Sequence, residues 1–142
     1  MSIEKSVVLK RLQFIANNLK ELRRFESMSL ENYLESFDQK LISERIMELI
    51  AQAAADINEH ILTRDFNVVI DSNRESFVQA GQHGIITTDV ADELSKSAGL
   101  RNILAHRYLE INYPSLFNSV QIALRYYPLY IQQIAEYLAR NI

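Results

Sequence analysis

Helical periodicity, almost uninterrupted by residues that break helices, constrains the fold of this chain most strongly. Only three glycines and two prolines occur in 142 residues. A many-stranded sandwich or barrel needs a turn about every 8–12 residues, so these numbers disfavour such folds. Apolar residues instead recur at steps of three to five, which keeps them on one face of a helix with about 3.6 residues per turn. In the first segment they are Ile3, Val7, Leu12, Ile15, Leu19 and Leu22.

This pattern predicts an all-α fold, an antiparallel up-and-down bundle of four long helices plus a short helix, with residues 1–142 forming one domain. The long helices are expected at residues 3–25, from a cap at Ser27 or Ser29 to near Thr63, from Thr87 or Thr88 past Asn102, and from Pro114 to the C-terminus.

Capping and breaking residues predict where these helices end. A break is expected near Ser36, and residues 64–72 should form an irregular apolar connector rather than a strand, because no partner strand is evident. The short helix should start at Ser72 or Asn73 and run through Ala80, and Gly81 and Gly84 should end it. Pro128 should kink or divide the last helix.

Composition excludes several classes of function. Without cysteine there is no disulfide, no thiolate zinc ligand and no thiol nucleophile. The net charge of -3 lacks the global basic character of many nucleic-acid binders, so any phosphate contact must be local or come from a dimer cleft. The absence of a Gly-rich phosphate loop argues against an ATPase or kinase. The N-terminus lacks the apolar core of a signal peptide, and no apolar run approaches about 20 residues, so we expect a cytoplasmic protein that does not contact membranes.

One ten-residue segment, from Gly99 to Tyr108, carries most of the reactive chemistry. It holds two guanidinium groups, an amide, an imidazole and a phenol. Asn102 and His106 are four residues apart and share a helical face. His106 and Tyr108 are two apart and would point away from each other on a helix, so a common direction requires the chain to open after His106. The spacing therefore predicts a helix that ends near His106. Taken alone, it also fits an ordinary surface histidine near a helix C-terminus.

The segment resembles a known motif. Arg101, His106 and Tyr108 match the Arg-x4-His-x-Tyr pattern of the HEPN superfamily, and more closely the HepT-like toxins of MNT–HEPN toxin–antitoxin systems. The resemblance extends to other segments of the chain, in order: Ser43-Glu44-Arg45-Ile46 followed by Gln52 and Asp56, Asn73-Arg74-Glu75-Ser76-Phe77 with Gly81, and Gly99-Leu100-Arg101-Asn102. The connector at residues 66–71 lacks the proline that is common in that family, which affects the loop path and not the motif.

The resemblance implies a metal-independent endoribonuclease that needs no cofactor. RNA brings its own nucleophile, the 2′-hydroxyl, so the protein has to supply proton transfer and charge stabilisation. His106 is then the general acid or base and Arg101 stabilises the transition state. Arg107 positions the RNA phosphate, and Asn102 positions that phosphate or His106. Because one histidine cannot easily make both proton transfers, the resemblance also implies a homodimer in which two motifs share one cleft.

For Tyr108 the resemblance implies modification by AMP, which a cognate MNT-type nucleotidyltransferase antitoxin attaches. The added negative charge would compete with RNA for Arg101 and Arg107. Without the resemblance, a tyrosine that packs its ring and exposes its hydroxyl is the common state.

Two other functions stay open on the sequence. The chain can be a non-catalytic nucleotide- or substrate-binding partner of a nucleotidyltransferase, or a helical interaction module. The remaining candidate residues are less informative: His60 and His83 lack a second ligand at metal-binding spacing, so no metal site is expected. The C-terminal tyrosines are expected in the core or an interface; they are Tyr126, Tyr127, Tyr130 and Tyr137.

Overall fold

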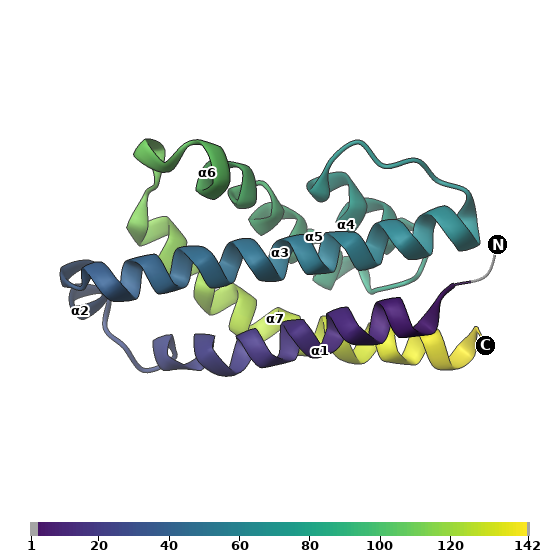
Figure 1. Ribbon diagram of the computed structural model, residues 1–142, viewed down its shortest axis with the longest axis horizontal. Helices are drawn as coiled ribbons and strands as arrows, with labels where there is room; N and C mark the ends of the chain where they lie inside the picture. The colour runs from purple at the N-terminus through teal and green to yellow at the C-terminus, as the bar shows by residue number, and fades with distance from the viewer. Residues whose placement is uncertain (1–2, 142) are drawn as a thin grey trace.

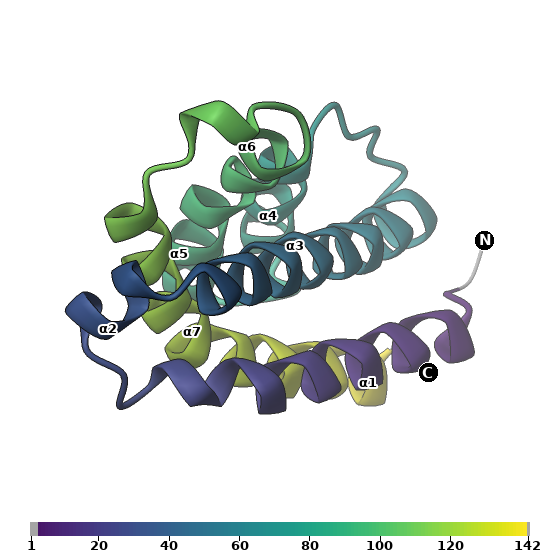
Figure 2. The ribbon, with the colours of Figure 1, turned by 60° about the vertical axis from the view of Figure 1, so that its left-hand side comes forward.

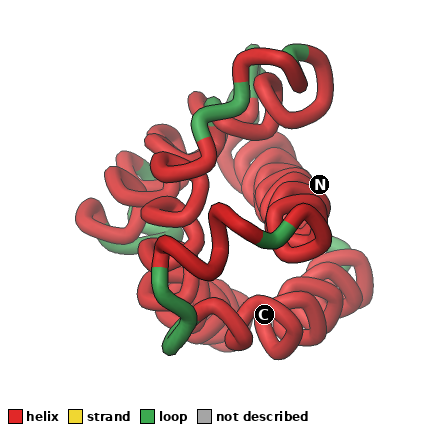
Figure 3. Tube along the Cα trace, turned by 90° about the vertical axis from the view of Figure 1, so that its left-hand side faces the viewer, coloured by secondary structure: helices red, strands yellow, loops and turns green. Residues whose placement is uncertain are grey.

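The computed structural model describes residues 3–141, and the side chains of Arg101 and Asn102 lie outside the described part. Every regular element within residues 3–141 is helical, so the all-α prediction is confirmed (Figure 3). The elements, with 3-10 helices labelled η, are α1 (Lys5–Leu22), η1 (Arg23–Phe25), α2 (Leu30–Glu35), α3 (Phe37–Phe66), α4 (Asn73–Gln82), α5 (Thr88–Ala98), α6 (Leu100–His106), η2 (Tyr108–Glu110) and α7 (Tyr113–Arg140).

Three long helices form the body of the bundle. α3 runs antiparallel to α1. α7 lies beside α1 and runs parallel to α3 (Figure 1). Between α3 and α7, the shorter helices α4, α5 and α6 return the chain along the other side of α3. As a result α6 and α1 lie on opposite sides of α3 (Figures 1 and 2).

Serine and asparagine side chains begin several helices where the sequence predicts starts. The hydroxyl oxygen of Ser36 accepts a hydrogen bond from the backbone N–H of Gln39 at 3.2 Å, so the predicted break between α2 and α3 is confirmed. Ser29, Ser72 and Asn112 cap α2, α4 and α7 in the same way. These local caps satisfy N–H groups that have no partner within the helix.

Two predicted helix ends differ from the structure. α3 continues past Thr63 to Phe66 and stops at Asn67, whose φ of 55° is left-handed. Gly81 lies inside α4 instead of ending it: a Cβ there would come within 2.6 Å of the Ala91 Cβ, so glycine permits the close approach of α4 and α5. Gly84, with a φ of 71°, makes the turn.

Gly99 and Pro128 act in opposite ways. The fourth long helix that the sequence predicts is interrupted at Gly99, which separates α5 from α6. Pro128 lies within α7 and does not divide it.

The core holds a polar network as well as apolar side chains. The Tyr130 hydroxyl donates to Asn58 Oδ1 at 2.6 Å, and the Asn58 amide donates to the Ser76 hydroxyl at 3.2 Å. All three side chains are buried, so the network links α7, α3 and α4 with its polar groups paired. In the described part of the chain, no helix is both long and apolar enough to cross a membrane.

Candidate active site at the end of α6

The short helix α6 holds the motif on the surface of the bundle. It packs against α3 and α5 (Figures 1 and 2). Leu104 is buried in the core and Leu100 is partly buried against it, so these two leucines attach α6 to the body of the molecule. His106, the last residue of α6, has an exposed side chain.

The helix ends at His106, as the spacing predicts. The backbone N–H of Arg107 still donates to the carbonyl of Ile103 at 2.8 Å, but Arg107 itself has φ -124° and ψ 46°, outside the helical region. The chain then makes the 3-10 turn η2, which the Glu110 N–H closes onto the Arg107 carbonyl at 2.8 Å. The departure at Arg107 breaks the helical register between His106 and Tyr108.

His106, Arg107 and Tyr108 all have exposed side chains. The Tyr108 side chain is 69% exposed, so its phenol is accessible to a second protein or a nucleotide. A Tyr that packs its ring and exposes only its hydroxyl is thereby excluded for the free chain. The backbone of Arg101 and Asn102 belongs to α6, but their predicted roles fall on side chains outside the described residues.

Arg107 forms an ion pair within the turn. Its Nη1 lies 3.7 Å from Oε2 of Glu110, and both side chains are more than half exposed. Exposed pairs of this kind contribute only about 0–1 kcal/mol, so the guanidinium stays exchangeable. Sequence reasoning passed over Glu110 and over Leu109, which is 89% exposed. The signal that was available is the Arg-x-x-Glu spacing across a turn.

The chain leaving η2 is attached to α3 by Tyr113. The Tyr113 hydroxyl donates to Glu44 at 3.1 Å, and Lys40 lies over the Tyr113 ring, 4.9 Å from its centroid. Desolvation by partial burial, followed by the nearby Glu44 carboxylate, raises the pKa of Tyr113. Glu44, which the sequence flags through the resemblance, therefore holds the connection between η2 and α7 in place.

The other candidate residues have structural surroundings. Tyr127, Tyr130 and Tyr137 are buried, as expected. The His83 ring packs against Phe66 at a tilt of 55°, with 4.7 Å between ring centroids, and its Nδ1 contacts the carbonyl of Gln79 at 2.9 Å. His60 accepts a hydrogen bond from the backbone N–H of Glu4 at 3.0 Å, which fastens the start of α1 to α3.

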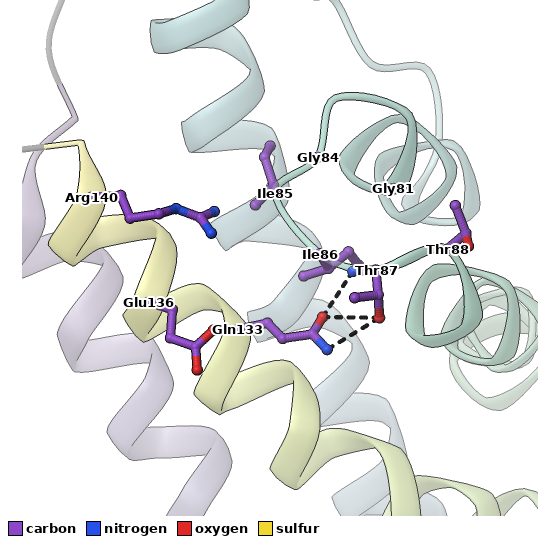
Figure 4. Close-up of a pocket in the computed structure, with 9 residues that line it drawn as sticks. All are labelled: Gly81, Gly84, Ile85, Ile86, Thr87, Thr88, Gln133, Glu136 and Arg140. Carbon is purple, nitrogen blue, oxygen red and sulfur yellow. Dashed lines mark hydrogen bonds between the residues drawn. The ribbon is translucent and has the colours of Figure 1, made fainter.

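A cavity of about 420 Å³ lies between the α4–α5 loop and the C-terminal part of α7 (Figure 4). None of its lining residues belongs to the segment from Gly99 to Tyr108. The Gln133 side chain lines this cavity and is hydrogen-bonded to Thr87. The Gln133 carboxamide oxygen accepts from the Thr87 N–H at 2.8 Å, and the Gln133 NH2 group donates to the Thr87 hydroxyl at 3.1 Å. This cavity is therefore separate from the motif, and its polar groups tie α7 to the start of α5.

Comparison with known proteins decides the family. The family described as ribonuclease HepT-like matches residues 15–134. The chain belongs to the HepT-like ribonuclease family. It is 42% identical over 137 residues to the "tRNA nuclease HepT" of Aphanizomenon flos-aquae, covering 96% of this chain and 93% of that protein. It is 33% identical over 88 residues to the "mRNA nuclease HepT" of Shewanella oneidensis, covering 62% and 66% of the two chains. This HepT-like protein is thus an endoribonuclease by class.

Solved structures agree with the fold. The tri-AMPylated HEPN toxin of Shewanella oneidensis, solved in complex with an MNT antitoxin, matches with a TM-score of 0.81 and 25% identity, covering 92% of this chain and 97% of the toxin. The cytosolic protein YutE of Bacillus subtilis, of unknown function, matches with a TM-score of 0.85 and 19% identity over 99% and 94% of the two chains, which shows the fold alone. The HepT-like chain is accordingly a nuclease of the toxin type.

Proposed function

We propose that this HepT-like protein is the toxin of a toxin–antitoxin pair and that it cleaves RNA without a metal ion, through attack by the RNA 2′-hydroxyl. The observation that carries the proposal is the exposed end of α6, where His106 and Tyr108 both reach solvent and the helix stops between them. The protein acts in the cytoplasm, where its RNA substrate is present.

The cleavage step divides the work among few residues. His106 takes the proton from the 2′-hydroxyl, whose oxygen attacks the adjacent phosphorus. The bond from phosphorus to the 5′-oxygen then breaks, and that oxygen receives a proton from an acid. The products are a 2′,3′-cyclic phosphate and a 5′-hydroxyl. Arg101 stabilises the charge on the non-bridging oxygens, and Asn102 and Arg107 hold the phosphate.

A second copy of the chain supplies the second proton donor. In one chain His106 is the only imidazole of the motif, and it lies on an open surface. A single imidazole that has just accepted a proton on one side of the phosphorus cannot also donate to the leaving oxygen on the other side. A homodimer that brings two α6 ends together provides an acid and a base of the same type and encloses the phosphate between them.

Tyr108 is the site at which a cognate MNT-type nucleotidyltransferase silences the toxin. The phenol oxygen attacks the α-phosphorus of ATP, pyrophosphate leaves, the phenol proton is lost, and AMP remains attached through a phosphodiester. Each phosphodiester adds one negative charge next to Arg107 and so repels RNA. The 69% exposure of Tyr108 and the AMP on the Shewanella toxin both support this proposal.

Cleavage by the purified protein in excess chelator tests the catalytic proposal. We expect labelled tRNA, chosen because the relative from Aphanizomenon is a tRNA nuclease, to yield fragments with cyclic phosphate ends. His106→Ala should lower the rate at least about 100-fold, as loss of a general acid–base group does. The control, His83→Ala, removes an imidazole that lies outside the motif and contacts Phe66 and Gln79, and it should cleave at the parental rate. Equal rates for His106→Ala and the parent would refute the assignment.

The same assay separates the alternative function. A chain that binds nucleotide or the nucleotidyltransferase but never cuts RNA, even with the motif intact, would be a non-catalytic binding partner.

Mass spectrometry tests the modification. Incubation with the cognate enzyme and ATP should add AMP to the peptide that contains Tyr108. Tyr108→Phe should abolish the mass increase, whereas Tyr126→Phe, at a half-buried tyrosine on α7, should leave it unchanged.

A further inference from the structure

The carboxylate of Glu110 lies beside a cation of the motif segment. It lies in η2, two residues after Tyr108, on the exposed side of the turn. Its carboxylate faces Arg107 at 3.7 Å. The same guanidinium is the group to which the proposed function assigns an RNA phosphate, so a carboxylate and a phosphate compete for one cation.

The turn holds the backbones of Glu110 and Arg107 close together. Its backbone N–H donates to the Arg107 carbonyl at 2.8 Å, which fixes the two residues one turn apart. In the described part of the chain the carboxylate pairs with Arg107 alone, and its side chain is 63% exposed. Bound phosphate must therefore displace a nearby anion or accept its repulsion, because at this distance water and salt screen the interaction only partly.

We propose that Glu110 is a positioning residue that holds Arg107 in the η2 turn and weakens RNA binding by competing with the substrate phosphate. The proposal rests on the proposed function. The ion pair keeps the free toxin's affinity for RNA low. The ion pair also opposes contact between Arg107 and an adenylyl phosphate attached to Tyr108, because that phosphate has to displace the same carboxylate.

Glu110→Gln tests this with almost no change in shape. RNA affinity is measured in a His106→Ala background so that the labelled tRNA stays intact. We expect binding about two- to fivefold tighter, the range that corresponds to an exposed ion pair, and the gain should shrink as salt is raised. In the cleaving protein the same change should lower KM while kcat stays close to the parental value.

The chain offers a closely matched control. Glu26 pairs with Arg23 across η1 at 3.9 Å, with both side chains more than half exposed. Glu26→Gln removes the same charge from the same kind of turn and should leave RNA affinity unchanged. A further variant, Arg107→Ala, should weaken RNA binding. Adding Glu110→Gln to Arg107→Ala should increase RNA affinity much less than Glu110→Gln does when Arg107 is present. Such coupling distinguishes competition at Arg107 from a general change in net charge.

The outcomes distinguish a failure of the Glu110 proposal from a failure of the ribonuclease proposal. If the parent cleaves RNA but Glu110→Gln binds no more tightly, or gains as much with Arg107→Ala as without it, the competition is refuted and the ribonuclease proposal stands. If the parent neither binds nor cleaves RNA, both proposals fail. Melting curves of the glutamine variants should match the parent, since an exposed ion pair contributes little to folding.

Discussion

The two 3-10 turns of this molecule, η1 and η2, share one construction and differ in their surroundings. Each follows an α-helix, and each is spanned by an Arg-x-x-Glu ion pair. The closing backbone hydrogen bond also matches, from Glu26 to Arg23 at 3.0 Å and from Glu110 to Arg107 at 2.8 Å. The residue before the glutamate differs completely: Phe25 is 0% exposed and Leu109 is 89% exposed.

The packing around each turn accounts for that difference. α7 packs against η1, and the Gln121 side chain donates to the Phe25 carbonyl at 2.8 Å. The Phe25 ring meets the buried Tyr33 edge-on, with 5.7 Å between centroids. η2 contacts mainly α6, the helix that carries it. The same local structure therefore serves as a core element at one place and as an exposed platform beside the motif at the other.

Truncation of the equivalent apolar residues tests the comparison with the largest expected effect. Phe25→Ala should lower the free energy of unfolding by about 3–5 kcal/mol, because it empties a buried site. Leu109→Ala should change it by less than about 0.5 kcal/mol, because its side chain is already in water. Denaturant unfolding of both variants measures the difference. Similar losses for the two would show that η2 is buried in the protein as it exists in solution.

The two tyrosines near the turns sharpen the comparison with a smaller effect. Tyr33 donates to or accepts from the Ser43 hydroxyl at 2.7 Å in the core, and burial raises its pKa to about 12, so the phenol stays protonated there. Tyr33→Phe should cost about 0.5–1.5 kcal/mol of stability without affecting AMP transfer. Tyr108→Phe should have the opposite profile, with unchanged stability and no modification. A stability loss at Tyr108 equal to that at Tyr33 would contradict the exposed placement.

A third measurement is the pH dependence of stability. Variants of the two turns should be compared at a pH where His60, outside both turns, does not itself change the stability of the fold. Desolvation, and then the Arg64 charge, lower the pKa of His60, which accepts the Glu4 N–H as a neutral imidazole. A histidine with a lowered folded pKa contributes stability above its unfolded pKa of about 6.5 and loses it as pH falls through that value toward the folded pKa. Stability should therefore decline below about pH 6.5, and less steeply in His60→Gln. Equal slopes in thermal melts across that range would reject this role for His60.

Several features of the fold follow from local patterns. Apolar spacing identified the helical segments, and short polar side chains such as Ser36 and Ser72 marked the helix starts through hydrogen bonds to residues three positions away. The end of α6 near His106 followed in the same way from spacing. The motif was found because its residues are close in sequence, although their proposed roles rest on the family resemblance and on the experiments described above.

Other features depend on residues far apart in the chain. Gly81 reads as a helix end, but it lies within α4 because Ala91 approaches it. The two turns share the Arg-x-x-Glu pattern, and that pattern does not reveal which of them a long helix will cover. Periodicity and capping act over one or two helical turns, so sequence is sufficient for them. Burial depends on which surfaces meet after the chain has returned on itself, and only the packed bundle places Phe25 in the core and leaves Leu109 and Tyr108 in solvent.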